Sequence, residues 1–267
     1  MKRSGAKFRA GLVQMRTGRT PQTNLDHAAA MIREAAGAGA DYVQTPEMTN
    51  IMELSREKLF AAITDEDKDI CLAALRELAR ELKIYLHIGS LAIKVSPEKA
   101  ANRAFMIDPQ GEIVARYDKI HMFDVDLANG ESYRESNNFR PGESAVVADL
   151  PFARFGLTIC YDLRFPALYR ALAEAGATVL TIPAAFTRQG GTHENGRSTF
   201  GHSLAVDPWG PIIAEGGTEP GVTLVEIDPA EVAAARAKVP SLQHGRRFDI
   251  VEPMAEPARL HVVGDTA

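Results

Sequence analysis

Three residues that could perform acyl-transfer chemistry each stand just past a segment with a strand pattern. Glu47 and Lys119 follow two such segments, and Cys160 closes the apolar run that begins at Phe155. Strand ends often carry sites in layered α/β folds, because the sheet is rigid while the following loop is free. A carboxylate, an ammonium and a thiol can supply a base, a cation for developing charge and a nucleophile. Each residue alone also fits an ordinary role, as a loop acid, a surface lysine or a core cysteine.

The surroundings of Cys160 bear on its reactivity. Pro166 stands where a first helical turn would begin, so we expect the thiol to face a helix N-terminus that favours a thiolate. A free thiol is only slightly ionised at neutral pH, so amide attack needs an adjacent base, which Glu47 supplies if burial raises its pKa. The other cysteine, Cys71, lies inside a predicted helix and is interpreted as structural. His121 is interpreted as a packing or solvated residue.

The elements that must position these residues alternate in the manner of an α/β protein. We expect helices at Leu25–Ala38 (capped at Thr23 or Asn24), Thr64–Leu82, Pro166–Gly176 and Pro229–Lys238, and strands at Phe8–Met15, Tyr42–Thr45, Ile84–Lys94, Asn102–Tyr117 with a hairpin turn at 108–111, Ala145–Leu150, Phe155–Tyr161, Thr178–Pro183, Ser203–Asp207, Ile212–Ala214 and Val222–Ile227. The stretch 118–142 has no clear period, and long irregular segments are often functional. We find no repeat or linker, and therefore predict one domain over 7–250 and a C-terminal tail over 251–267.

Composition excludes several classes of function. The 267 residues contain 30 Lys and Arg against 35 Asp and Glu, with no basic run, which disfavours a nucleic-acid partner. The longest apolar runs have the length of strands, so we expect no membrane span, and the N-terminal stretch lacks the pattern of a signal peptide. Two cysteines form no disulfide framework, which favours the reducing cytoplasm. Neither CxxC nor HExxH occurs, and we expect no metal and no cofactor.

Three separated motifs resemble one family. TPEMTN around Glu47, YDKIHMFD around Lys119 and GLTICYDLRFP around Cys160 are similar to motifs of the nitrilase-like carbon–nitrogen hydrolases and stand in that family's order. NRAFMIDPQG, FRPG and GHSLAVDPWG extend the similarity over nearly the whole chain. The resemblance implies a four-layer αββα sandwich, a homodimer, and Cys160 as nucleophile, Glu47 as general base and Lys119 as the cation for the oxyanion. It also implies a second glutamate, which we place at Glu135, with Glu131 as the alternative.

The resemblance further implies a small-molecule substrate. CYDLRFP, VDPWG and VPSLQHGRR look most like the amidases of deaminated glutathione, and next like the ω-amidases of α-ketoglutaramate. Arg164 is a candidate carboxylate clamp, because guanidinium pairs bidentately with carboxylates, although an ion pair with Asp162 is the alternative. We expect Tyr161, Tyr133 and Phe123 to line the substrate pocket. A Cys–His protease is disfavoured, since no histidine stands in an orienting context.

One departure from the family is large. After Gln189 the sequence runs straight into Gly190-Gly191-Thr192, where the resemblance implies a further helix and an inner strand, about 25 residues in all. The four candidate catalytic residues precede this apparent deletion. We expect Ser203–Asp207 either to fill the vacancy or to leave a sheet edge bare. A catalytically compromised family member with an interaction role is therefore the alternative to an active amidase.

Overall fold

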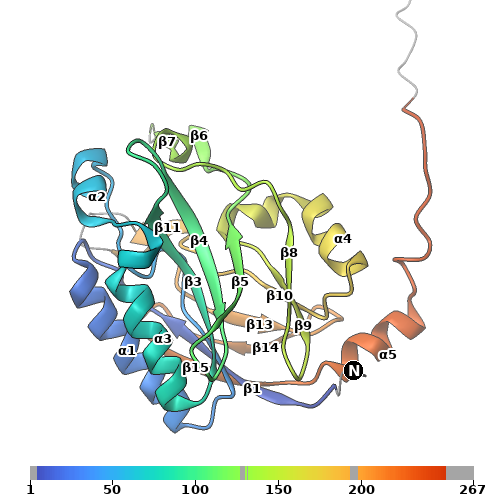
Figure 1. The fold of residues 1–267 in the computed structure, drawn as a ribbon. Coiled ribbons are helices and arrows are strands. Elements are labelled where there is room, and N and C mark those ends of the chain that lie inside the picture. Colours follow the sequence, from blue (N-terminus) through green and yellow to red (C-terminus); the bar gives the residue numbers. More distant parts are fainter. Residues whose placement is uncertain (1–4, 127–129, 131, 193–197, 251–267) are drawn as a thin grey trace, which may run out of the picture.

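The structure is a computed structural model that describes residues 5–126, 130, 132–192 and 198–250 (Figure 1). A six-stranded sheet forms its centre, in the order β15-β1-β2-β3-β4-β5. These strands are β1 (Phe8–Gln14), β2 (Tyr42–Gln44), β3 (Tyr85–Lys94), β4 (Ala100–Ile107), β5 (Ile113–Asp118) and β15 (Gly221–Ile227). The β1–β2 and β2–β3 pairs are parallel, and the other pairs are antiparallel. The predicted turn at 108–111 connects β4 to β5.

Two helices cover one face of this sheet, α1 (Pro21–Gly37) and α3 (Ile70–Leu82) (Figure 1). Helix α1 begins at its proline, before the predicted cap, and Asn24 instead hydrogen-bonds the backbone of Gly18 and Asn50. Helix α3 begins later than predicted, because the Asp69 carboxylate accepts from the Leu72 N–H at 2.7 Å and caps it there. Cys71 is buried in this helix, as predicted, and burial raises the pKa of its thiol to about 12.

The opposite face of the six-stranded sheet packs against a second layer of strands. This layer contains a three-stranded sheet of β8 (Val146–Asp149), β9 (Arg154–Leu157) and β10 (Val179–Thr181), and a two-stranded sheet of β13 (Leu204–Val206) and β14 (Ile212–Glu215). Phe8 stacks on Phe152 between the layers with ring centroids 4.2 Å apart. Helix α4 (Pro166–Glu174) begins at its proline, as predicted, and covers β9 from outside (Figure 1). The layers are therefore helix, sheet, sheet, helix, as expected.

The second layer is divided into two pieces. Among the described residues, β10 pairs only with β9, and β13 pairs only with β14. The described residues between β10 and β13 form only the short pair β11 (Thr187–Thr192) and β12 (Ser198–Thr199), without the helix and inner strand that the family resemblance implies. In the part of the chain that the structure describes, the edge is therefore bare, which is one of the two outcomes predicted for Ser203–Asp207. Apolar side chains of β10, β13 and β14 are accordingly exposed, namely Leu180, Leu204, Val206, Ile212 and Ile213.

The remaining elements include several that the sequence pattern did not predict. They are helix α2 (Arg56–Ala62) and, within the stretch expected to be irregular, β6 (Asp124–Asp126), β7 (Ser132–Arg134) and a 3-10 helix at Glu135–Asn137. Helix α5 (Ala230–Lys238) follows β15, and residues 239–250 then run past α4 and away from the body (Figure 1). The predicted tail 251–267 lies outside the described residues. Within the described part of the chain, no helix is both long and apolar enough to span a bilayer.

Candidate active site

The three candidate residues converge from two different sheets. Glu47 follows β2 and Lys119 follows β5, whereas Cys160 follows β9 in the second layer and begins a short 3-10 helix, Cys160–Arg164. All three side chains are buried, with relative exposures of 5%, 2% and 6%. Cys160 has a φ of 49°, in the left-handed region, and its N–H donates to the Pro183 carbonyl at 2.9 Å. The structure thus brings them together at the edge where both sheets end.

Close approach of backbones fixes the relation between the two sheets here. Gly89 of β3 lies against the loops after β2 and β10, where a Cβ would meet the Thr45 oxygen at 2.0 Å and the Pro183 Cβ at 2.5 Å. Only glycine leaves room for this contact. Pro183 also holds the Cys160 N–H, so the same contact links the turn before Glu47 to the nucleophile.

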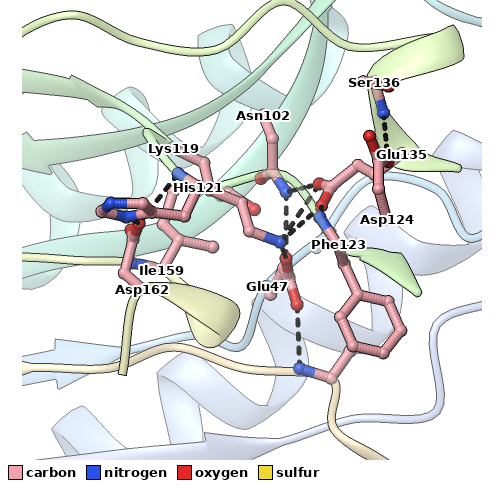
Figure 2. Close-up of polar contacts among 12 residues, drawn as sticks. Glu47, Asn102, Lys119, His121, Phe123, Asp124, Glu135, Ser136, Ile159 and Asp162 are labelled. Atoms are coloured by element: carbon pink, nitrogen blue, oxygen red, sulfur yellow. Dashed lines mark hydrogen bonds and ion pairs between the residues drawn. The ribbon is translucent and has the colours of Figure 1, made fainter. Parts of the chain in front are cut away.

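Lys119 lies at the centre of the charged cluster (Figure 2). Its Nζ donates to Glu47 Oε1 at 2.9 Å and to the two Glu135 oxygens at 3.1 and 2.9 Å. Burial alone lowers the pKa of Lys119, but the two carboxylates outweigh it and raise that pKa above its ordinary value of 10.5. Lys119 is therefore a permanent cation at neutral pH. Glu131, the alternative second glutamate, lies outside the described residues.

The expected thiolate at Cys160 is contradicted. Burial raises the pKa of the thiol, the Glu47 carboxylate raises it further, and Lys119 opposes this only in part. A 3-10 turn, rather than an α-helix, begins at Cys160, and such a short turn sums few peptide dipoles. The resting group is a neutral thiol hydrogen-bonded to Glu47. The carboxylate must therefore remove its proton during attack.

Beneath the nucleophile lies a buried network that the sequence did not reveal. Asp162 is fully buried, and its carboxylate accepts from the Ile159 N–H at 2.8 Å and from His121 Nδ1 at 2.7 Å (Figure 2). It also accepts from the Tyr117 hydroxyl at 2.6 Å. The His121 ring also stacks on Phe165, with centroids 3.5 Å apart. Asp162 is thus satisfied by these partners, and the alternative considered for Arg164, an ion pair with Asp162, is not formed. The stacking confirms the packing role predicted for His121, whereas its hydrogen bond to Asp162 was not predicted, although the histidine in the lysine motif was the available signal.

Three of the four predicted pocket residues, the aromatic ones, lie together. Phe123 lies 5.2 Å from Tyr161 and 5.5 Å from Tyr133 between ring centroids, and its N–H donates to Glu135 Oε2 at 2.7 Å. These rings therefore adjoin the charged cluster. Arg164 is exposed and has no hydrogen bond or ion pair with any residue that the structure describes. It is available for a ligand, but nothing orients it.

Comparison with known proteins identifies the family. The family model described as carbon–nitrogen hydrolase matches residues 9–189 and 181–237. The chain belongs to the carbon–nitrogen hydrolase family. The resemblance noted in the sequence is thereby confirmed, and the chain is an amidase-type hydrolase. The match to this hydrolase family falls into two segments that meet at 181–189, the same place where the second layer of strands is divided.

Relatives of this carbon–nitrogen hydrolase include amidases. The deaminated glutathione amidase of Yersinia enterocolitica is 34% identical over 91% of this chain and 94% of that protein. The omega-amidase NIT2 of Homo sapiens is 31% identical over 94% of this chain and 99% of that protein. A solved mutant of the amidase from Nesterenkonia sp. AN1 shows the result of Michael addition of acrylamide at its active site cysteine. It has 26% identity and a TM-score of 0.73, over 88% of this chain and 98% of that one.

Proposed function

We propose that this carbon–nitrogen hydrolase cleaves the amide of a small anionic ω-amide, of the deaminated glutathione type, to a carboxylate and ammonia. The observation that carries the proposal is the buried cluster in which one ammonium contacts two carboxylates beside a neutral thiol. The proposed nucleophile is Cys160, the general base is Glu47, the oxyanion cation is Lys119, and Glu135 is the second glutamate. The names of the relatives support the substrate class.

The chemistry follows from the protonation states. As the Cys160 sulfur bonds to the amide carbon, its proton moves to Glu47, and the Lys119 ammonium stabilises the oxyanion. Glu47 then returns the proton to the leaving nitrogen, ammonia departs and a thioester remains. Water attacks this thioester, gives a proton to Glu47 and releases the carboxylic acid, while that proton restores the thiol. Glu47 is thus protonated in part of the cycle and ionised in the rest, while Lys119 remains the cation of the cluster throughout.

The anionic end of the substrate would bind outside the charged cluster. Arg164, within the turn that begins at Cys160, offers a guanidinium that no described residue pairs, and Phe123, Tyr133 and Tyr161 would flank the part of the substrate that joins its two ends. An ω-amidase acting on α-ketoglutaramate is the alternative within the same chemistry. A shorter substrate would place its carboxylate nearer the thiol, so chain-length preference separates the two.

A second candidate function rests on the divided second layer. Exposed apolar side chains on β13 and β14, such as Val206 and Ile213, offer a surface that association would bury. A catalytically compromised family member with an interaction role would use that surface alone. For the active enzyme we propose a homodimer in the cytoplasm, where a nucleophilic thiol stays reduced. Light scattering of Val206→Lys against the parent chain tests whether this face contributes to the dimer.

Ammonia release from a panel of ω-amides tests the function. We expect turnover of deaminated glutathione or α-ketoglutaramate, at least 10³-fold reduced by Cys160→Ala as for loss of other covalent nucleophiles, and a higher KM for both acids after Arg164→Ala. The panel's relative rates then name the substrate branch. No turnover by a cooperatively folding parent chain would overturn the enzymatic proposal in favour of the compromised member.

A further inference from the structure

Asn102 contacts every charged residue of the cluster (Figure 2). It lies in β4 and is 1% exposed, and its Nδ2 donates to Glu47 Oε1 at 2.9 Å and to Glu135 Oε1 at 3.1 Å. The backbone carbonyl of Asn102 accepts from the backbone N–H of Lys119 at 3.0 Å. One residue thus joins the two carboxylates through its side chain and holds the lysine through its backbone.

These bonds hold both oxygens of the Glu47 carboxylate beside the thiol. Oε1 accepts from Asn102 and Lys119, and Oε2 accepts from the Ala185 N–H at 3.0 Å. Two donors on one oxygen fix the carboxylate plane. An amide is suited to this place because it donates without carrying charge or exchanging a proton. A second ammonium or a hydroxyl would change the proton balance of the cluster or its geometry.

The other end of the amide indicates that this role is not mere packing. Asn102 Oδ1 is buried and accepts no hydrogen bond from the described residues, which is unfavourable for a polar atom. Asn24 offers the contrast: it is equally buried at 1%, yet its Oδ1 accepts from the Gly18 N–H at 2.7 Å while its Nδ2 donates to two carbonyls. A structural asparagine uses both ends. Asn102 uses only the end that faces the carboxylates.

We propose that Asn102 is a positioning residue of the reaction, an inference that rests on the proposed function. Its side-chain amide holds Glu47 ionised and aimed at Cys160, and the same amide holds Glu135 beside Lys119. Removing the amide withdraws a hydrogen-bond donor from the charged form of Glu47, which favours its protonated form. The neutral thiol then faces a base that is protonated over a wider range of pH. Loss of the Asn102 amide should therefore lower kcat and shift the acid limb of the pH profile.

The first test is the kinetics of Asn102→Ala. We expect kcat to fall about 10- to 100-fold, the loss of charge-assisted hydrogen bonds at a base, with KM changed less than about threefold. We also expect the acid limb of kcat/KM to move up by about one pH unit. Asn24→Ala is the matched control, which should lower the melting temperature yet leave kcat and the acid limb in place. An unmoved acid limb in Asn102→Ala, or equal shifts in both variants, would overturn the proposal.

A second readout works without turnover. In a Cys71→Ala background, alkylation of Cys160 by iodoacetamide, followed against pH by mass spectrometry, reports the first ionisation of the Cys160–Glu47 pair. We expect its acid limb to rise by about one pH unit in Asn102→Ala, and an unchanged limb contradicts the role. If the parent chain releases no ammonia, the proposed function fails while this measurement still decides the role of Asn102. Should the alanine variant not fold, Asn102→Asp keeps the shape, and its alkylation at neutral pH must be slowed.

Discussion

Replacing Lys119 by methionine removes the one cation buried between Glu47 and Glu135 among the described residues. Its Nζ contacts three carboxylate oxygens at 2.9 to 3.1 Å, and the lysine side chain is only 2% exposed. Breaking a buried pair while the partner charge remains costs about 3–5 kcal/mol. We therefore expect Lys119→Met to lower the unfolding free energy by about that amount at pH 7. Loss of the oxyanion cation should lower kcat about 10²- to 10³-fold.

The pH dependence of this stability loss has a definite sign. The pKa of Lys119 is raised in the folded chain above the ordinary 10.5, so its stabilisation is fully present below pH 10.5 and is lost only as the pH rises through the folded pKa. Urea unfolding at pH 7 and pH 9 should therefore give the same difference between Lys119→Met and the parent. Because the loss arises from stranded carboxylates, adding Glu135→Gln to Lys119→Met should restore part of it.

The control is the exposed ion pair of Lys68 with Asp65, whose side chains are 66% and 54% exposed. Lys68→Met should leave the unfolding transition unchanged, because water screens that pair. The reasoning is refuted if Lys119→Met unfolds at the same urea concentration as Lys68→Met. It is also refuted if the double variant with Glu135→Gln is less stable than Lys119→Met alone.

Three further predictions concern the same edge of the molecule. Glu47→Gln should lower ammonia release about 10²- to 10⁴-fold. Cys160 should still be alkylated at neutral pH, because the variant removes the Glu47 charge that raises the thiol pKa while Lys119 remains. A thiol that mass spectrometry finds unmodified would contradict this. Gly89→Ala should lower the unfolding free energy by about 1–3 kcal/mol and reduce kcat, since its Cβ would press on the loops beside the nucleophile. Thermal unfolding and ammonia release measure the two effects. An unchanged stability would count against the close contact. Backbone amides of β10, at a bare edge, should exchange hydrogen faster than those of β9, and equal protection by mass spectrometry speaks against the divided layer.

Local patterns in the sequence were enough for most elements but not for their boundaries. The β1, β3, β5 and α4 segments carry strong apolar periods or a proline at the first turn, and each lies within a few residues of its predicted position. Helix α1 starts four residues earlier than predicted, because Pro21 rather than Leu25 opens it. Asn24, one of the two residues predicted as the cap, instead hydrogen-bonds Gly18, in the loop before the helix, and Asn50. Such tertiary hydrogen bonds leave no periodic signal.

The candidate site was predicted as isolated motifs, and the structure supplies their contacts. The positions of Glu47, Lys119 and Cys160 at strand ends could be read from the sequence, whereas the protonation state of the thiol could not, since it depends on burial and on which charges surround it. Asn102 stood inside a recognised motif with no chemistry assigned to it. An ion pair with Asp162 was the alternative to a carboxylate clamp at Arg164, but the Asp162 carboxylate accepts from the Tyr117 hydroxyl instead. Contacts between distant segments decide such roles.

The divided second layer and the candidate site meet at one element, β10. Among the described residues this strand pairs only with β9, yet the residues after it contact the site. The Pro183 carbonyl accepts the Cys160 N–H at 2.9 Å, and the Ala185 N–H donates to Glu47 Oε2 at 3.0 Å. Fraying of β10 would therefore remove one hydrogen bond from the nucleophile and one from the base. The charged cluster itself is anchored on β2, β4 and β5 of the intact six-stranded sheet, which the division does not reach. Because these two hydrogen bonds reach the nucleophile and the base from the end of β10, we expect substitutions that loosen this strand to lower activity.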